Sequence, residues 1–177
     1  MAKDMQRNID WQALATRLGA FSEPNAELGS SAMARAALEE IVGPQALRDA
    51  VDHYVARAPG AELARSVLWQ LHPWSAMQRC HEIFLTSPDL EARRTAIELL
   101  RVVADGRALP WIAQYLADPD PRIQFWGAGI LDQLLFSSLV ELDDCTSLLD
   151  AMAVHENEKI REQHAALMEI VSGTDPA

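Results

Sequence analysis

The chain has 177 residues, of which 49% are apolar and 23% charged, and its formal net charge is −11. This composition is ordinary for a soluble globular protein that can bury a core, and it excludes a disordered chain. No stretch approaches the roughly 18 uninterrupted apolar residues of a membrane span, the first ten residues do not resemble a secretory signal, and Cys80 and Cys145 give no disulfide framework. We therefore expect a cytoplasmic protein without membrane contact.

The sequence predicts helices from end to end. Apolar residues recur with the 3.6-residue period of amphipathic helices, and no segment alternates apolar and polar residues as strands do. Proline, glycine and acidic or amide residues interrupt this pattern nine times, which predicts about ten short helices. The breaks lie at residues 22–25, 42–45, 58–61, 71–74, 87–90, 104–107, 118–121, 137–144 and 155–158.

These helices repeat in pairs at intervals of about thirty residues. The second helix of each pair can be aligned on a small or apolar residue followed by a polar one. The aligned pairs are Ala34-Arg35, Ala64-Arg65, Ala92-Arg93, Ile123-Gln124 and Ile160-Arg161. Three residues earlier lie the expected helix N-caps, where a side-chain oxygen accepts from the first-turn amides. They are Ser31, Asp89, Asp120 and Asn157, with Ala61 as the exception.

The fourth pair shows the inward face most clearly. Its second helix is expected to bury Ile123, Gly127, Ile130 and Leu134, which follow helical spacing. Gly127, together with Gly129, has a steric explanation, since neighbouring hairpins must approach closely there. In the last helix, His164 shares the inward stripe with Ile160, Leu167 and Val171.

Hairpins of this length, with Asp or Pro-Asp in the inner turn as in "SPDLEARRTAIELL" and "DPDPRIQFWGAGIL", resemble HEAT-like (armadillo-type) helical repeats. The likeness covers residues 30–171 and, more weakly, the first hairpin. It implies an all-α fold, a right-handed α-α superhelix of about five hairpins within a single domain, residues 1–177. The hairpins would span about 10–42, 44–72, 73–104, 107–136 and 141–172. The chain departs from the pattern at Ala61, at Gln124 and in the long connection 137–144.

Acidic residues concentrate at the C-terminal end of the chain. Residues 1–122 hold 16 acidic and 13 basic residues, whereas residues 123–177 hold 10 acidic residues against Lys159 and Arg161 alone. A negative field repels nucleic acid phosphates and attracts basic proteins. The arginines are spread along the chain, and i,i+4 spacing predicts helix-surface pairs such as Arg48–Asp52 and Arg94–Glu98. We expect no nucleic acid partner.

Members of the HEAT superfamily are mostly scaffolds and protein-binding modules, and a minority resemble DNA alkyl-base glycosylases or phycobilin lyases. We expect a non-enzymatic protein-protein interaction module, such as an immunity protein or antitoxin, which binds a basic partner through an acidic C-terminal surface and is a monomer or a weak dimer. Two alternatives stay open. One is a glycosylase-like or lyase-like enzyme that acts from the concave groove with Trp126, His164 or nearby acids, and the other is an adaptor subunit of a larger scaffold.

The candidate protein-binding residues are the acids of the last two helices and one aromatic pair. Glu158, Glu162 and Glu169 fall on one side of the last helix, although a solvated outer face is the simpler interpretation. The aromatic pair, Phe125-Trp126, either packs between repeats or anchors a partner. The complete set is Glu141, Asp143, Asp144, Asp150, Glu158, Glu162, Glu169, Phe125 and Trp126.

The sequence offers no convincing catalytic or metal-binding constellation. The stretch "HEIF" at 81–84 resembles the start of a zinc-protease helix, but Leu85 stands where the second histidine is needed. His72, Cys80 and His81 are close in sequence but would need a further ligand. The other histidines, His53, His155 and His164, lie in three separate elements without a nucleophile beside them. We expect no catalytic residue, no metal ion and no cofactor.

Overall fold

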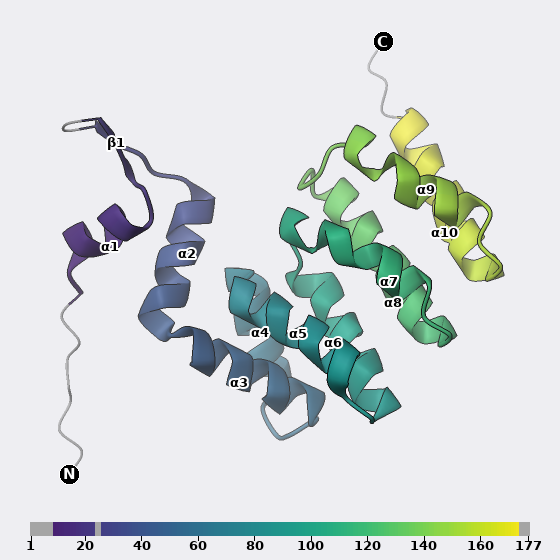
Figure 1. The fold of residues 1–177 in the computed structure, drawn as a ribbon, viewed down its shortest axis with the longest axis horizontal. Helices are drawn as coiled ribbons and strands as arrows, with labels where there is room; N and C mark the ends of the chain where they lie inside the picture. The colour runs from purple at the N-terminus through teal and green to yellow at the C-terminus, as the bar shows by residue number, and fades with distance from the viewer. Residues whose placement is uncertain (1–8, 24–25, 174–177) are drawn as a thin grey trace.

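The computed structural model describes residues 9–23 and 26–173, and this part of the chain is helical (Figure 1). Its α-helices are α1 (Trp11–Arg17), α2 (Ser31–Val42), α3 (Pro44–Val55), α4 (Ala61–Leu71), α5 (Trp74–Thr86), α6 (Leu90–Val103), α7 (Ile112–Leu116), α8 (Pro121–Phe136), α9 (Thr146–Ala153) and α10 (Glu158–Gly173). Two short 3₁₀ helices, η1 (Gly106–Trp111) and η2 (Asp143–Cys145), precede α7 and α9. No described helix has both the length and the apolar character that a membrane crossing requires.

One element differs from the predicted helices. Strands β1 (Phe21–Glu23) and β2 (Ala26–Glu27) pair antiparallel between α1 and α2. The sequence pattern predicts only a helix break at this point, because strands of two and three residues are too short to show the period-two alternation.

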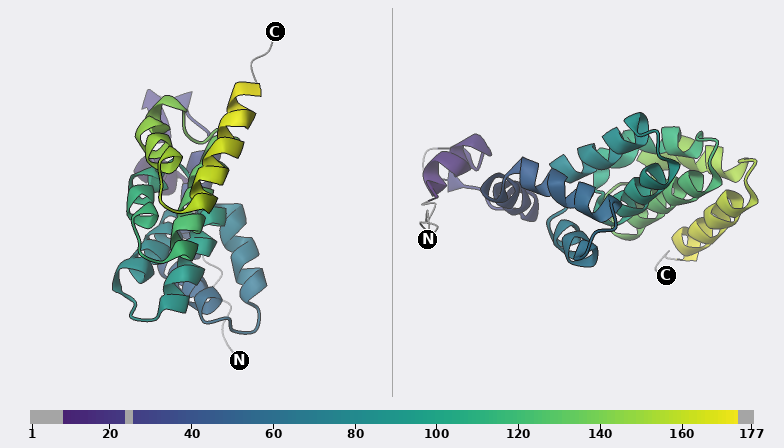
Figure 2. Two further views of the ribbon diagram at one scale, coloured as in Figure 1. Left: turned by 90° about the vertical axis from the view of Figure 1, so that its right-hand side faces the viewer. Right: turned by 90° about the horizontal axis from the view of Figure 1, so that it is seen from below.

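From α3 onward the helices form two layers. Consecutive helices pack as the pairs α3–α4, α5–α6, α7–α8 and α9–α10. The second helices, α4, α6, α8 and α10, also contact one another in sequence and lie side by side, and Figure 2 (left) looks along this row with α9 and α10 nearest the viewer. This packing is compatible with a helical superhelix.

Helix N-caps lie where the repeat alignment predicts them in three of the four cases. Asp89 accepts from the Glu91 amide at 2.9 Å, Asp120 from the amides of Arg122 and Ile123 at 3.1 and 3.2 Å, and Asn157 from the Lys159 amide at 3.1 Å. The prediction for Ser31 is wrong by one residue. Ser30 is the cap, and its hydroxyl accepts from the Met33 amide at 3.2 Å, because either serine can supply the oxygen.

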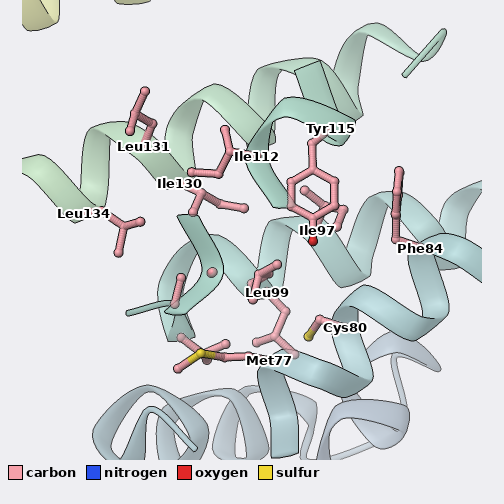
Figure 3. Packing of buried hydrophobic residues seen from close by; sticks show 14 of the residues in the cluster. Met77, Cys80, Phe84, Ile97, Leu99, Ile112, Tyr115, Ile130, Leu131 and Leu134 are labelled. Atoms are coloured by element: carbon pink, nitrogen blue, oxygen red, sulfur yellow. The ribbon is translucent and has the colours of Figure 1, made fainter. Parts of the chain in front are cut away.

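The core is continuous from one hairpin to the next. The four predicted inward residues of α8, Ile123, Gly127, Ile130 and Leu134, are all buried. Side chains from α5, α6, α7 and α8 converge on the same interior, as Met77, Leu99, Ile112, Tyr115 and Ile130 show in Figure 3. In α10, Ile160 and Leu167 are buried as predicted, whereas His164 is only half-buried.

Two glycines of α8 mark close approaches to other helices. A Cβ added to Gly127 would lie 2.6 Å from Tyr115 Cβ, and one added to Gly129 would lie 3.1 Å from Arg101 Cδ. The steric explanation is therefore confirmed, with one correction. Gly129 accommodates α6 of the preceding hairpin, but Gly127 accommodates α7 of its own hairpin.

The arginine pairs expected within single helices are wrong. Arg48 of α3 binds Glu82 of α5, and Arg94 of α6 binds both Glu91 in its own helix and Asp120 at the start of α8, so both arginines connect neighbouring hairpins. An inter-helix carboxylate is already positioned by packing, whereas an i,i+4 pair must order two long side chains. Glu98, the expected partner of Arg94, therefore forms no ion pair with it.

Further polar contacts connect α2 and the hairpin turns to their neighbours. Glu39 of α2 accepts from the amides of Trp74 and Ser75 at 2.9 and 2.7 Å, and thus caps α5 from outside the helix. Near the turns, Asn157 Nδ2 donates to Gln124 Oε1 at 2.8 Å, and His155 Nε2 donates to the Leu116 carbonyl at 3.0 Å. These bonds join α2 to α5 and the last hairpin to the one before it.

Candidate protein-binding groove

A groove lies across the second helices of the hairpins. One cavity of about 550 Å³ is lined by residues of α6, of α8 and of the start of α10. A second cavity of about 410 Å³ extends it toward α3 and α4, and the two cavities share Arg57, Thr95 and Glu98. We call this continuous surface the groove. Figure 2 (right) shows α4 and α10 at the two ends of the helix layer that forms it.

The aromatic pair Phe125-Trp126 both seals the core and lines the groove. Both side chains are half-buried and pack against the core cluster, and both also face the larger cavity. Their rings meet edge to face, with centroids 5.2 Å apart and an interplanar angle of 67°. The guanidinium of Arg101 lies 5.6 Å from the centroid of the Trp126 ring. The pair is thus fixed in place while part of its surface stays accessible.

Three arginines surround Glu91 in the lining of the groove. Arg94 binds Glu91, while Arg57 and Arg122 lie 3.7 and 3.9 Å from the same carboxylate. Arg94 also binds Asp120, and this hydrogen bond holds the pKa of Asp120 below its usual value despite the opposing effect of burial. Glu91 and Asp120 are therefore engaged by cations within the protein.

The acidic candidates lie on α10, α9, η2 and the connection before η2. Glu158, Glu162 and Glu169 are exposed on one side of α10, opposite the buried Ile160 and Leu167. Glu158 also lines the groove with Phe125 and Trp126. The other acids are exposed on η2, α9 and the connection before them, namely Asp143, Asp144, Asp150 and Glu141. Among the predicted residues, the groove thus unites Phe125, Trp126 and Glu158.

A separate apolar cavity of about 520 Å³ lies between the end of α8, the connection 137–142 and α10. Leu135, Leu142 and Leu167 line it together with Glu141, and the nearby Phe136 is 77% exposed. Sequence reasoning missed this cavity because the helix pattern ends at Phe136, and the connection is brought back against α10 only by the tertiary fold.

His81 and Cys80 lie within the packed interior of α5 and its neighbours. His81 stacks on Trp111 with centroids 4.4 Å apart, and its Nδ1 lies within hydrogen-bonding distance, 2.8 Å, of the Tyr115 hydroxyl. Burial lowers the pKa of His81 and raises that of the Cys80 thiol well above its usual range, so this thiol is a poor nucleophile. His164 is not among the residues that line the groove. The described residues contain no group of three or more His, Cys, Asp or Glu side chains that could hold a metal ion.

Glu98 is the groove residue that sequence reasoning missed. It is half-buried on α6 and lines both cavities of the groove. The i,i+4 spacing pairs it with Arg94, but Arg94 binds Glu91 in the same helix and Asp120 at the start of α8.

The chain was also compared with known proteins. No family model matches it, and neither the curated proteins nor the solved structures yield a match.

Proposed function

We propose that this protein is a non-enzymatic protein-binding module built of about five HEAT-like hairpins in a right-handed superhelix, which binds a basic partner protein. The binding surface consists of the acidic side of α10 and the adjoining groove. A cytoplasmic immunity protein or antitoxin that covers a cationic toxin is the concrete version, with the protein acting as a monomer or a weak dimer.

The observation that carries this proposal is the position of Glu158. It belongs both to the acidic side of α10 and to the lining of the groove, beside Phe125 and Trp126. Half-buried aromatic side chains are typical anchors of protein interfaces, and surrounding charges steer the encounter and select the partner. The two features that sequence reasoning singled out separately therefore adjoin one another on a single surface.

The alternatives differ in what they require of the groove. A glycosylase-like or lyase-like enzyme would act with Trp126, His164 or nearby acids. His164 lies outside the groove lining, so the reacting group would have to be an acid of the same cavity, such as Glu98 or Glu158. An adaptor subunit would use the same surface as the favoured module and would differ only in its partner.

The test is capture of the partner from the native host. We expect the tagged protein to retain one predominant basic protein at low salt and to lose it as salt is raised, because charge attraction between exposed groups is screened. The double variant E162K/E169K should retain about tenfold less of it, since like charges then face each other.

The control is E40K/D49K, which changes the net charge equally at exposed positions on α2 and α3. It should retain the partner as the wild type does. The proposal fails if the amount of partner retained does not depend on salt concentration, or if it falls equally in both variants. Either result would show that the acidic side of α10 does not carry the interaction.

A further inference from the structure

Glu98 is a partly buried carboxylate that forms no ion pair with the described residues. Neither a hydrogen bond nor an ion pair reaches its side chain from the described residues, whereas Glu91 and Asp120 nearby are both engaged by arginines. Partial burial makes an isolated charge costly, and a cation that approaches it gains more than it would in open solvent. Glu98 is therefore the acid of the groove with the most to gain from a cation supplied by another molecule.

Aromatic side chains lie on both sides of this carboxylate. Tyr54 lines the smaller cavity with Glu98, and Phe125 and Trp126 line the larger one. Burial and then the charge of Glu98 raise the pKa of Tyr54, which agrees with the closeness of the two side chains. Aromatic faces attract ammonium and guanidinium groups and pack against their methylene stems. The surroundings of Glu98 thus suit a long basic side chain.

Four cations line the groove without pairing with Glu98, namely Arg57, Arg94, Arg122 and Lys159, and Arg57 lines both cavities as Glu98 does. Arg57 and Arg122 are 72% and 67% exposed and lie near Glu91, and Arg94 is held by Glu91 and Asp120. Arg101 lies over Trp126. None of these cations forms an ion pair with Glu98 in the described structure, so this carboxylate lies without a partner in a lining that carries both charges.

We propose that Glu98 binds one arginine or lysine side chain of the partner, inserted into the groove between Tyr54 and the Phe125-Trp126 pair. The occupant is a basic segment of a protein, selected by its charge complementarity to Glu98. This inference rests on the proposed function, because it specifies which chemistry of a basic partner the groove recognises.

The test uses blocked tripeptides as probes, so that it needs no knowledge of the partner. The ¹⁵N-labelled full-length protein is titrated with acetyl-Gly-Arg-Gly-amide, and backbone amide shifts are followed by NMR. We expect saturable shifts at residues 95–98 and 125–127 with a dissociation constant in the millimolar range, and a weaker response to the lysine peptide. The glutamine and glutamate tripeptides should give none.

The matched variants are E98Q and E162Q, which remove one charge each without altering side-chain size. E98Q should weaken arginine peptide binding about fivefold, the loss expected for one partly exposed ion pair, and E162Q should leave it unchanged. Equal weakening in both variants, tighter binding of the glutamate peptide, or no saturable shift at these residues would overturn the proposal.

The two proposals can fail separately. If the peptide binds at Glu98 but E162K/E169K still captures the partner, the proposal that the acidic side of α10 binds the partner is wrong, and the proposal for Glu98 stands. If E162K/E169K loses the partner but the peptide does not bind, the proposal that Glu98 binds a basic side chain is wrong, and the proposal that α10 binds the partner stands.

Discussion

Arg94 of α6 binds Asp120 at the start of α8 and so connects two consecutive hairpins. Asp120 is buried, and besides this ion pair it caps α8 through the amides of Arg122 and Ile123. A single carboxylate thus fixes the start of one helix and its position against the preceding hairpin.

Removing this carboxylate should cost more stability than removing a simple cap. We expect Asp120→Ala to lower the free energy of unfolding by about 2 kcal/mol, the upper part of the range for N-cap loss. Asp89→Ala is the control, because Asp89 caps α6 but is exposed and has no arginine partner among the described residues. It should cost about 1 kcal/mol. Urea unfolding measures both, and equal losses would contradict a role in joining the hairpins.

The two glycines of α8 should respond differently to the same substitution. Gly127→Ala places its methyl against Tyr115 Cβ, which is fixed to the α7 backbone, and should destabilise the protein by about 2 kcal/mol. Gly129→Ala meets the end of the Arg101 side chain, which can move aside, while the helix gains propensity. The second variant should be neutral or slightly stabilising in thermal unfolding. A reversed order would show that α7 and α8 do not approach as described.

Glu39 should contribute more to the free energy of unfolding than its neighbour Glu40 does. Glu39→Ala leaves the Trp74 and Ser75 amides at the start of α5 without their acceptor, and about 1–2 kcal/mol of unfolding free energy should be lost. Glu40→Ala removes only an exposed ion pair with Arg17 and should cost under about 0.5 kcal/mol. Chemical unfolding of both variants, with Glu40→Ala as control, tests whether α2 is joined to α5 by this carboxylate. Similar losses would argue against it.

His81 should make the protein less stable in mild acid. Burial lowers the pKa of His81 in the folded state, so the folded protein favours the neutral ring. Its contribution is complete above the unfolded pKa of about 6.5 and is lost as the pH falls through the folded value. His81→Phe should therefore flatten the decline of unfolding free energy below about pH 6.5.

Tyr115→Phe provides the control for this pH dependence. It removes the hydroxyl near His81 Nδ1 but leaves the imidazole buried against Trp111, so the decline should persist. Unfolding curves at several pH values report the slope. A wild-type slope in His81→Phe would assign the decline to other groups.

Much of the fold could be predicted because it follows from local sequence. Caps such as Asp89 and Asp120 act within one helical turn, and the buried stripe of α8 follows from helical periodicity alone. The groove could not be predicted in the same way. Whether Arg94 binds Glu98 in its own helix or Asp120 in the next depends on the spacing between hairpins, which no local pattern encodes. The same spacing decides that Phe125 and Trp126 are half-buried.

The bonds between neighbouring hairpins have a consequence for binding. Arg94–Asp120 and Asn157–Gln124 fix the positions of α6, α8 and α10 near their first turns, beside the residues that line the groove. The shape of the groove is therefore fixed by contacts within the protein. In the proposed complex, association would order mainly exposed side chains such as those of Arg57 and Arg122, so less conformational entropy would be lost on binding.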